Sequence, residues 1–511
     1  MAHAEQDLMA RLRGPHAPHL LGLGTAGAPD HGASLTAHDA KELYFGLLHA
    51  QPDAVMLAQA RDFLSRQMAA AAHTDADLPS DMSDLALWMK SNSAAVGRQY
   101  RDYLAHRRNG GPRRYFQTKS HALYFLKAVA PTKLVDGAWL YGVVPQWRDA
   151  RYAELIRIYL EELGDGDPGR NHVLLYKALL ASHECRQWEA LDASHFVQGA
   201  IQLSLAQHTE ELVPEVIGFN LGYEQLPLHL LICAYELNEL GIDPYYFTLH
   251  VTIDNAASGH AARAAQSVLD ALPHLGDQEA FYRRVRDGYR LNAMGKGTLE
   301  VIAGFDLERE LLAMLATKAP VGASLHSDSC RIGGRTVNEW LSTPGQMRDF
   351  VNALEKAGWI RRHEPPENSR FWALLTGDKG PMFGVFNAYE RQLIHDWIAG
   401  DSLSASSLAS DPYRNRERSS AAWRKRANAC PGPEFGEELR FTDDGPRSSG
   451  FAALLPPDDV REETRLLRDT LAKAKNRAAA MDLLVPWLSP VHHHTPAGLL
   501  ATRLFNQALR A

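Results

Sequence analysis

Cysteine is scarce in this chain, and its four residues lie far apart in the sequence: Cys185, Cys233, Cys330 and Cys430. No two of them form a CxxC pair, so the sequence has neither the thiolate pairs of a zinc site nor a disulfide framework. Isolated cysteines of this kind are typical of reduced thiols. We therefore expect a cytoplasmic protein.

Long apolar runs are also absent. No stretch approaches the roughly 18 residues of a membrane-spanning helix, and residues 19–28, which contain three glycines, make a poor signal peptide. The net charge of −7 favours neither a nucleic acid nor an anionic membrane as a partner. The 511 residues suffice for several domains with a sizeable core.

Helical patterns dominate the chain, and the breaks between them suggest its divisions. We expect an N-terminal helical extension over residues 1–110, a helical core over 111–300, and a region over 301–400 that packs on this core. Residues 401–450 are rich in Ser, Arg, Pro, Gly and Asp, which predicts a flexible loop. Helices are expected again over 451–511.

The region 301–400 has a winged-helix-like pattern. Two helices are expected within residues 336–357, followed by short strands near 358–362 and 369–375. This arrangement leaves open a contact with a nucleic acid, with a partner protein or with the rest of the chain. The acidic net charge argues against DNA. Further along, the run His492-His493-His494 is interpreted as a surface loop.

The first chemical signal lies in a helix that is expected to begin at Tyr245. Asp243 is a good N-cap, and Pro244 suits the first helical position. His250 and Asp254 are four residues apart, so they share one face of this helix. Burial of these groups among apolar neighbours costs free energy unless a partner or a metal ion satisfies them.

His260 fits this face less well. It lies six residues beyond Asp254, about 240° further round a straight helix. It joins the same site only if the helix is distorted near Ser258 and Gly259. The alternative is a capped helix that has one hydrogen bond between His250 and Asp254, with His260 unrelated to them.

Two further elements offer ligands. Residues 211–240 predict one long core helix, kinked at Pro227. In an antiparallel pair with the next helix, Glu224 would lie near Asp254 and, more loosely, near His250, with Glu215 further out. Glu162 ends an amphipathic helix over 149–162, and His172 begins the next helix. The GDGDPG loop between them lacks the spacing and the final Glu of a calcium loop.

The candidate ligands are carboxylates and imidazoles on core helices: Glu162, His172, Glu224, His250, Asp254 and His260. Facing helices of a bundle build di-iron carboxylate sites from such residues, and these donor atoms suit iron or manganese. The Glu-x-x-His pair of ferritin-like proteins is missing.

The chain resembles the haem-oxygenase-like di-iron oxidases and oxygenases, also called iron-containing redox enzymes. The resemblance lies in E-L-G-x-G-x-x-x-x-N-H (Glu162 to His172), in G-Y-E-Q-L-P (Gly222 to Pro227) and in L-H-x-x-I-D-N-x-x-S-G-H-A (Leu249 to Ala261). Many members place the last His three residues after the Asp, where this chain has Ala257. That departure suggests a longer-chain branch of the family.

This resemblance implies an all-α fold with a haem-oxygenase-like helical bundle as its core. It implies that the six candidate residues bind two Fe(II) ions, the second weakly, and that Glu224 is a bridge. O2 would be the co-substrate in the oxidation of a small amine or an amino-acid-like metabolite, with N-oxygenation as the favoured reaction. Oxidative desaturation or C–C cleavage at the same site is the alternative.

The resemblance also bears on partners. A small-molecule substrate is expected, an external electron donor and a homodimer are compatible with the family, and neither a membrane nor a nucleic acid is expected. The rival from another class is a metal-binding or interaction protein without turnover.

Overall fold

The computed structural model describes residues 40–49, 52–253, 259–343, 345–376, 382, 384–402 and 462–510. Within these ranges the regular structure is helical except for one antiparallel hairpin, formed by β1 (Arg331–Ile332) and β2 (Arg335–Thr336). The prediction of an all-α fold is therefore confirmed. None of the described helices combines the length and the apolar character that a membrane span requires. The predicted loop over 401–450 lies almost entirely outside the described residues.

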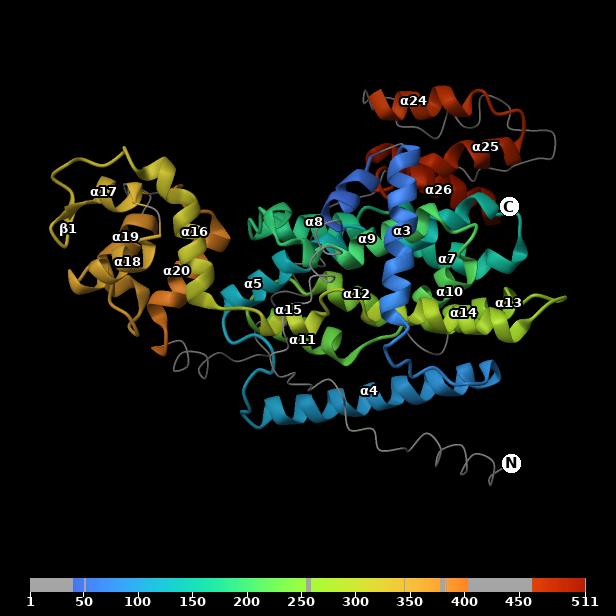
Figure 1. The fold of residues 1–511 in the computed structure, drawn as a ribbon, viewed down its shortest axis with the longest axis horizontal. Helices are drawn as coiled ribbons and strands as arrows, with labels where there is room; N and C mark the ends of the chain where they lie inside the picture. Colours follow the sequence, from blue (N-terminus) through green and yellow to red (C-terminus); the bar gives the residue numbers. More distant parts are fainter. Residues whose placement is uncertain are drawn as a thin grey trace.

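The N-terminal part consists of a helical segment over residues 40–47, α3 (Ala54–Ala71), η1 (Met82–Asp84) and α4 (Leu85–Arg108). The side chain of Asp53 caps α3 by accepting a hydrogen bond from the backbone of Met56. In Figure 1, α3 crosses the helices of the core, and α4 runs along one edge of them. Tyr44 and Phe63, both fully buried, belong to the same hydrophobic cluster as the core helices.

The core follows from residue 119 onward. Its α-helices are α5 (Lys119–Ala128), α6 (Ala130–Lys133), α7 (Ala153–Glu162), α8 (His172–Ser182), α9 (Val197–Gln207), α10 (Val213–Tyr223), α11 (Leu228–Glu239), α12 (Tyr245–Ile253), α13 (His260–Asp270), α14 (Gln278–Arg290) and α15 (Thr298–Ala303). Short 3-10 helices connect them: η2 (Ala138–Gln146), η3 (Ala150–Tyr152), η4 (Gly164–Gly166), η5 (Trp188–Ala190), η6 (Ala193–His195) and η7 (Leu291–Ala293).

Two predicted helices are divided in the structure. The long helix expected over 211–240 is α10 followed by α11, because Pro227 adopts an extended conformation (φ −84°, ψ 149°) and Glu224 already ends α10 as its C-cap. The helix expected from Tyr245 to Ala265 is represented by α12 and α13, and Gly259 is the N-cap of α13. Residues 254–258 lie outside the described part, so Asp254 has no described position.

Glycines allow α10 and α14 to touch backbone to backbone. A Cβ atom at Gly218 would lie 1.8 Å from the carbonyl oxygen of Val285, and one at Gly288 would lie 2.0 Å from that of Glu215. Arg284 on α14 also donates hydrogen bonds to both carboxylate oxygens of Glu215. Glu215, the weaker candidate ligand, therefore has a structural role that ties α14 to the helix that ends at Glu224.

The region after the core forms a lobe with its own hydrophobic cluster. It contains α16 (Leu307–Gly322), the hairpin, α17 (Val337–Ser342), α18 (Met347–Lys356), η8 (Pro366–Asn368), α19 (Arg370–Thr376) and α20 (Ala388–Ala399). Figure 1 shows these elements apart from the rest. Tyr389 and Leu393 of α20 belong to the second core cluster, which includes α5. The domain boundaries at 110, 300 and 400 stay a prediction.

The strand predicted near residues 369–375 is wrong, because this segment forms α19. A short apolar run such as Phe371 to Leu375 fits a strand and a buried helix equally well by its pattern. No β-strand is described at 358–362 either. The only hairpin within the described residues precedes α17, and it is held there by the capping box of Thr336 and Glu339.

The C-terminal part packs back onto the core. It contains α24 (Glu462–Leu471), α25 (Arg477–Leu484), η9 (Val485–Leu488) and α26 (Pro496–Arg510). Leu488 and Phe505 share a hydrophobic cluster with Ile158 and Leu163 of the core, and α26 lies close to α7 in Figure 1. The interpretation of 492–494 as a surface loop is wrong for His493, which is only 3% exposed because the core covers it.

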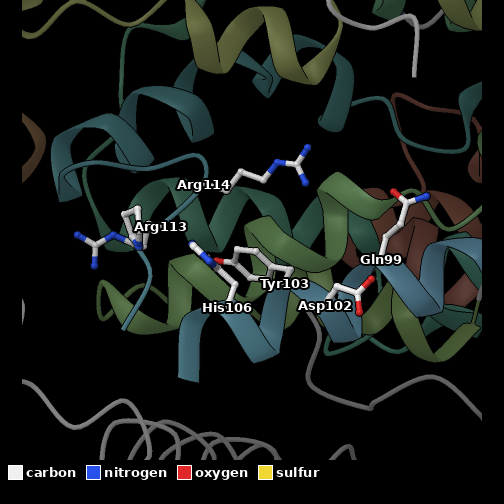
Figure 2. Close-up of a pocket in the computed structure, with 7 residues that line it drawn as sticks. Gln99, Asp102, Tyr103, His106, Arg113 and Arg114 are labelled. Atoms are coloured by element: carbon white, nitrogen blue, oxygen red, sulfur yellow. The ribbon is translucent and has the colours of Figure 1, made fainter. Parts of the chain in front are cut away.

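An open surface pocket of about 410 Å³ lies where α4 meets the loop that precedes α5 (Figure 2). Tyr103, Arg113 and Arg114 contribute to its lining. Beneath it, the fully buried Glu236 accepts hydrogen bonds from the Tyr103 hydroxyl and from the backbone N–H groups of Arg114, Tyr115 and Phe116. The pocket is thus shaped by a structural anchor, and none of the five candidate ligands that the structure describes lines it.

Candidate metal centre

Five of the six candidate ligands come together in the core, where Asp136 joins them. These six side chains form two buried groups that could each hold a metal ion: Asp136, Glu162, His172 and His250 in group 1, and Glu162, Glu224 and His260 in group 2. Within each group, one donor atom per residue lies within 4.8 Å of the others. Glu162 belongs to both groups, so the two candidate sites share a carboxylate.

The loop between Glu162 and His172 brings these two residues face to face. Gly164, Asp165 and Gly166 all have positive φ angles, of 67°, 54° and 83°, which reverse the chain directly after α7. Asn171 then caps α8 by accepting a hydrogen bond from the backbone of Leu174. His172 consequently points back toward the carboxylate that ends the preceding helix, and the two are in direct contact.

Asp136 enters group 1 from the turn between α6 and η2. The next residue, Gly137, has a φ angle of 80°, and a Cβ atom there would lie 3.0 Å from the Cβ of Glu162. Glycine is needed at this position both for the backbone conformation and for the space. The turn can therefore pass close enough to α7 to place Asp136 beside Glu162.

Hydrogen bonds orient the other side chains of group 1. The hydroxyl of Tyr246 donates to Oδ2 of Asp136, and Nε2 of His250 lies 3.5 Å from the same oxygen. Nδ1 of His250 lies 2.8 Å from the backbone oxygen of Tyr246, to which it can donate its proton. That bond favours the tautomer with an unprotonated Nε2, which is the form that binds metal.

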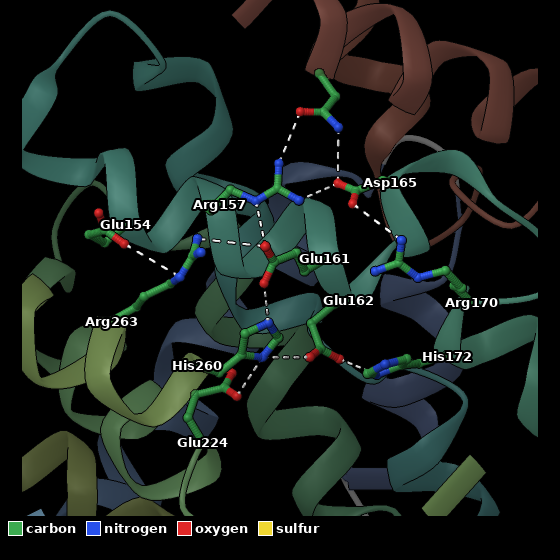
Figure 3. Close-up of polar contacts among 11 residues, drawn as sticks. Glu154, Arg157, Glu161, Glu162, Asp165, Arg170, His172, Glu224, His260 and Arg263 are labelled. Carbon is green, nitrogen blue, oxygen red and sulfur yellow. Dashed lines mark hydrogen bonds and ion pairs between the residues drawn. The ribbon is translucent and has the colours of Figure 1, made fainter. Parts of the chain in front are cut away.

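In group 2, His260 lies between three carboxylates (Figure 3). Its Nδ1 is 3.0 Å from Oε2 of Glu224 and 3.3 Å from Oε1 of Glu162, while its Nε2 is 2.8 Å from Oε2 of Glu161. Nδ1 thus faces the group. Nε2 faces an outer carboxylate, an arrangement that fixes the tautomer and the ring orientation of metal-binding histidines.

The carboxylates and imidazoles shift each other's pKa values. Burial alone would lower the pKa of His172 and of His260, but the facing carboxylates Glu162 and Glu224 raise both instead. Burial would raise the pKa of Glu162, and the two histidines hold it well below its ordinary value. The pKa of His250 is lowered by burial and by the charge of His172. Without metal, His172 and His260 therefore bind protons more strongly than ordinary histidines, which offsets the charge of the carboxylates.

Two buried polar atoms indicate that the two groups can accommodate an ion or a water molecule besides protons. Nε2 of His172 and Oε1 of Glu224 have no hydrogen-bond partner among the residues that the structure describes. Buried polar atoms without a partner are rare in proteins and call for an explanation such as an ion or a water molecule. Carboxylate oxygens and imidazole nitrogens are donors that iron accepts. The residues present therefore fit an iron site.

Comparison with known proteins found one family that is similar to part of this chain. The match covers residues 123–293, which include the six residues of the two groups. The family is that of iron-containing redox enzymes. The resemblance seen in the sequence is confirmed, and with it the haem-oxygenase-like character of the helical core. No curated protein and no solved structure was found to match the chain.

Two carboxylates of this candidate metal centre, Asp136 and Glu161, were not found from the sequence. Asp136 lies in a turn and has no helical spacing to any candidate ligand, and Glu161 was overlooked because Glu162 beside it matched the motif. The one available signal for Asp136 was its position directly before a glycine in an apolar stretch. The assignment of a bridge also differs, since the shared residue is Glu162 and not Glu224.

The variant Asp136→Asn tests whether group 1 binds metal. We expect the affinity of one metal ion per chain to fall by more than the roughly 10–100-fold that loss of an outer partner causes, while the second ion stays bound. Glu154→Gln is the control, because Glu154 on α7 belongs to neither group and lies 3.8 Å from Arg263. Metal content by elemental analysis is the measurement. Equal metal content in both variants would exclude Asp136 as a ligand.

Proposed function

We propose that this chain is a non-haem di-iron oxidoreductase that uses O2 to oxidise a small amine or an amino-acid-like metabolite, with N-oxygenation as the favoured reaction. The observation that carries the proposal is Glu162, a buried carboxylate common to two groups of potential ligands. A carboxylate shared in this way is how a bundle holds two metal ions side by side. The family match supports iron as the metal.

The ligands follow from the two groups. Asp136, Glu162, His172 and His250 would hold one iron, and Glu162, Glu224 and His260 the other, with Asp254 as a further ligand that the sequence suggests. When bound, two ferrous ions can supply the two electrons with which O2 yields one oxygen atom to an amine nitrogen and one to water. The chain's own residues determine where protons and water have access.

Aromatic side chains enclose the first group. Tyr246 packs edge-on against Tyr176 and His250, with ring centroids 4.7 and 5.0 Å apart, and all three are buried. Such a wall keeps water from the reacting atoms and strengthens electrostatic interactions inside the site. In the metal-free protein, burial raises the pKa of the Glu224 carboxyl, and the neighbouring Glu162 adds to that effect.

Lys133 supports an amino-acid-like substrate. Its ammonium group lies 5.5 Å and 5.9 Å from the ring centroids of Tyr223 and Tyr246, beside group 1. The side chain is 19% exposed, and its ion pair with Asp136 is long, with Nζ 3.8 Å from Oδ1. The two aromatic rings hold this cation in place. At 3.8 Å, its ammonium group is too far from Asp136 for a hydrogen bond. A substrate carboxylate is the chemical group that suits it.

The variant Lys133→Gln tests this preference. We expect binding of carboxylate-bearing amino acids to weaken by about 10–100-fold, because a hydrogen bond to a charged group contributes roughly 1.5–3 kcal/mol. The corresponding amino-acid amides should bind the variant and the wild type alike. KM values from O2 uptake over a panel of amino acids and amides are the measurement. A variant that loses acids and amides equally, or loses metal, would contradict the assignment.

The function itself is tested by metal loading and O2 consumption. The protein is loaded with Fe(II) without air and then mixed with O2, alone and with small amines and amino acids. About two irons per chain, together with O2 uptake and product formation that depend on one of these compounds, would support the proposal. Hydroxylamine products would identify N-oxygenation, and alkenes would identify desaturation or C–C cleavage. Stable iron that never reacts with O2 would favour a metal-binding protein without turnover.

A further inference from the structure

The C-terminal part of the chain contacts the metal centre from outside the family match. The loop between Glu162 and His172 packs directly on α26, because a Cβ atom at Gly166 would lie 2.4 Å from the carbonyl oxygen of Leu499. Arg503 on α26 also donates a hydrogen bond of 2.9 Å to the backbone oxygen of Gly166. The segment that links two candidate ligands is thus held by residues beyond position 293.

A first hydrogen-bonded connection runs from His493 to group 1. The side-chain amide of Asn171, fully buried, donates to Nδ1 of His493 over 3.1 Å and to the backbone oxygen of Leu163 over 3.2 Å. Leu163 directly follows Glu162, and Asn171 directly precedes His172. His493 therefore holds a side chain that connects the backbones next to both ligands.

The electrostatic state of His493 suits this contact. Burial holds its pKa well below the ordinary value, and the nearby His494 and Lys177 add to the effect. A neutral imidazole can accept at Nδ1, as the amide of Asn171 requires. A protonated one could not.

A second connection runs from Asn506 on α26 to group 2. Figure 3 shows its inner part, from Arg157 through Glu161 to His260. The amide of Asn506 accepts from Nη1 of Arg157 and donates to Oδ1 of Asp165, both over 3.0 Å. Arg157 donates from Nε to Oε1 of Glu161 over 2.7 Å, and the other oxygen of Glu161 lies 2.8 Å from Nε2 of His260. The orientation of His260 is thereby tied to α26.

From these contacts we propose that residues 476–510 are a positioning element of the metal centre, in which His493 orders the ligands of group 1 through Asn171 and Asn506 orders His260 through Arg157 and Glu161. The inference rests on the proposed metal centre. It adds that this centre is incomplete without a segment that lies outside the matched family region. Outer partners of metal ligands change metal affinity by about 10–100-fold.

The test compares the two connections in full-length proteins that retain one group each. Glu224→Gln disrupts group 2 and keeps group 1 intact, whereas Asp136→Asn disrupts group 1 and keeps group 2 intact. Co(II) is the probe, titrated without air and followed by its visible absorption. We expect His493→Ala to weaken Co(II) binding 10–100-fold in the Glu224→Gln protein and to have little effect in the Asp136→Asn protein. Asn506→Ala should show the opposite preference.

Controls separate positioning from general stability. Gln507→Ala alters an exposed neighbour of Asn506 on the same helix and should leave both affinities unchanged. His493→Gln retains an acceptor for Asn171 and should recover most of the affinity that His493→Ala loses. If the alanine variant does not fold, the glutamine variant still tests the contact. The wild-type protein with Co(II) shows whether the metal centre itself exists.

The outcomes are distinct. Opposite preferences of the two alanine variants would support the inference. Equal losses in both single-group proteins, or no loss in either, would overturn it while leaving the metal centre intact. A wild-type protein that binds neither Co(II) nor Fe(II) would overturn the proposed function, and this inference with it.

Discussion

Replacement of Glu162 by glutamine is expected to remove both metal ions. The side chain keeps its size but loses the charge and one of the two oxygens with which Glu162 belongs to both groups. Each affinity should fall by more than the roughly 10–100-fold that is typical of lost outer partners. Elemental analysis of the protein loaded with Fe(II) should then find close to no iron, where Asp136→Asn retains one ion per chain.

The metal-free Glu162→Gln protein should also be less stable. His172 is in direct contact with Glu162 and loses its main counter-charge, whereas His260 keeps Glu161 and Glu224. Removal of one partner of a buried ion pair typically costs about 3–5 kcal/mol. Urea unfolding followed by circular dichroism measures this change, with Glu154→Gln as the control on the same helix. In the metal-binding experiment, a Glu162→Gln protein that still binds one metal ion with wild-type affinity would show that Glu162 is not a ligand in both groups.

Residue type and local breaks were sufficient to name five of the six residues that the structure brings together in the two groups. His172 begins a helix because Asn171 is a good cap after a glycine-rich loop, and the structure starts α8 at that residue. The distortion that His260 would need to join the site corresponds to a new helix that starts there, with Gly259 as its cap. These signals are local, and the family motifs added the identity of the metal.

Other parts of the site depend on contacts between distant segments, which spacing cannot reveal. Asp136 reaches Glu162 only because Gly137 lets a turn approach α7. Glu224 was expected to be the bridge, whereas the carboxylate that belongs to both groups is Glu162. The extended backbone at Pro227 ends α10 at Glu224. His493 was interpreted as part of a surface loop, but it is buried against Asn171 of the core, 322 positions earlier in the chain.

Metal binding is expected to release protons and to strengthen as pH rises. In the metal-free protein the facing carboxylates outweigh burial and raise the pKa values of His172 and His260, so both rings hold their protons more strongly than an ordinary histidine does. A divalent ion competes with those protons for the same nitrogens. Up to two protons per chain should therefore be released, and the overall affinity should rise by up to about tenfold per pH unit for each proton.

The sign follows from the direction of the shifts. Since both histidine pKa values are raised, protons still compete with the metal ion above the ordinary histidine value of about 6.5, so the affinity keeps rising with pH through the neutral range. Glu161 stays ionised throughout this range. Burial would raise its pKa, but hydrogen bonds from His260 and Arg157 lower it to about 2. The contact that orients His260 therefore does not titrate with the site.

Isothermal titration calorimetry with Mn(II) at pH 6.5, 7.0 and 7.5, in two buffers of different ionisation enthalpy, counts the released protons. The variant His260→Gln should release one proton fewer than the wild type, because its side chain carries none to displace. An affinity that is flat over this range, or equal proton release by the two proteins, would mean that the ion does not replace the protons held between His260 and the carboxylates. The two groups would then be an ion-pair network of the core and not a metal centre.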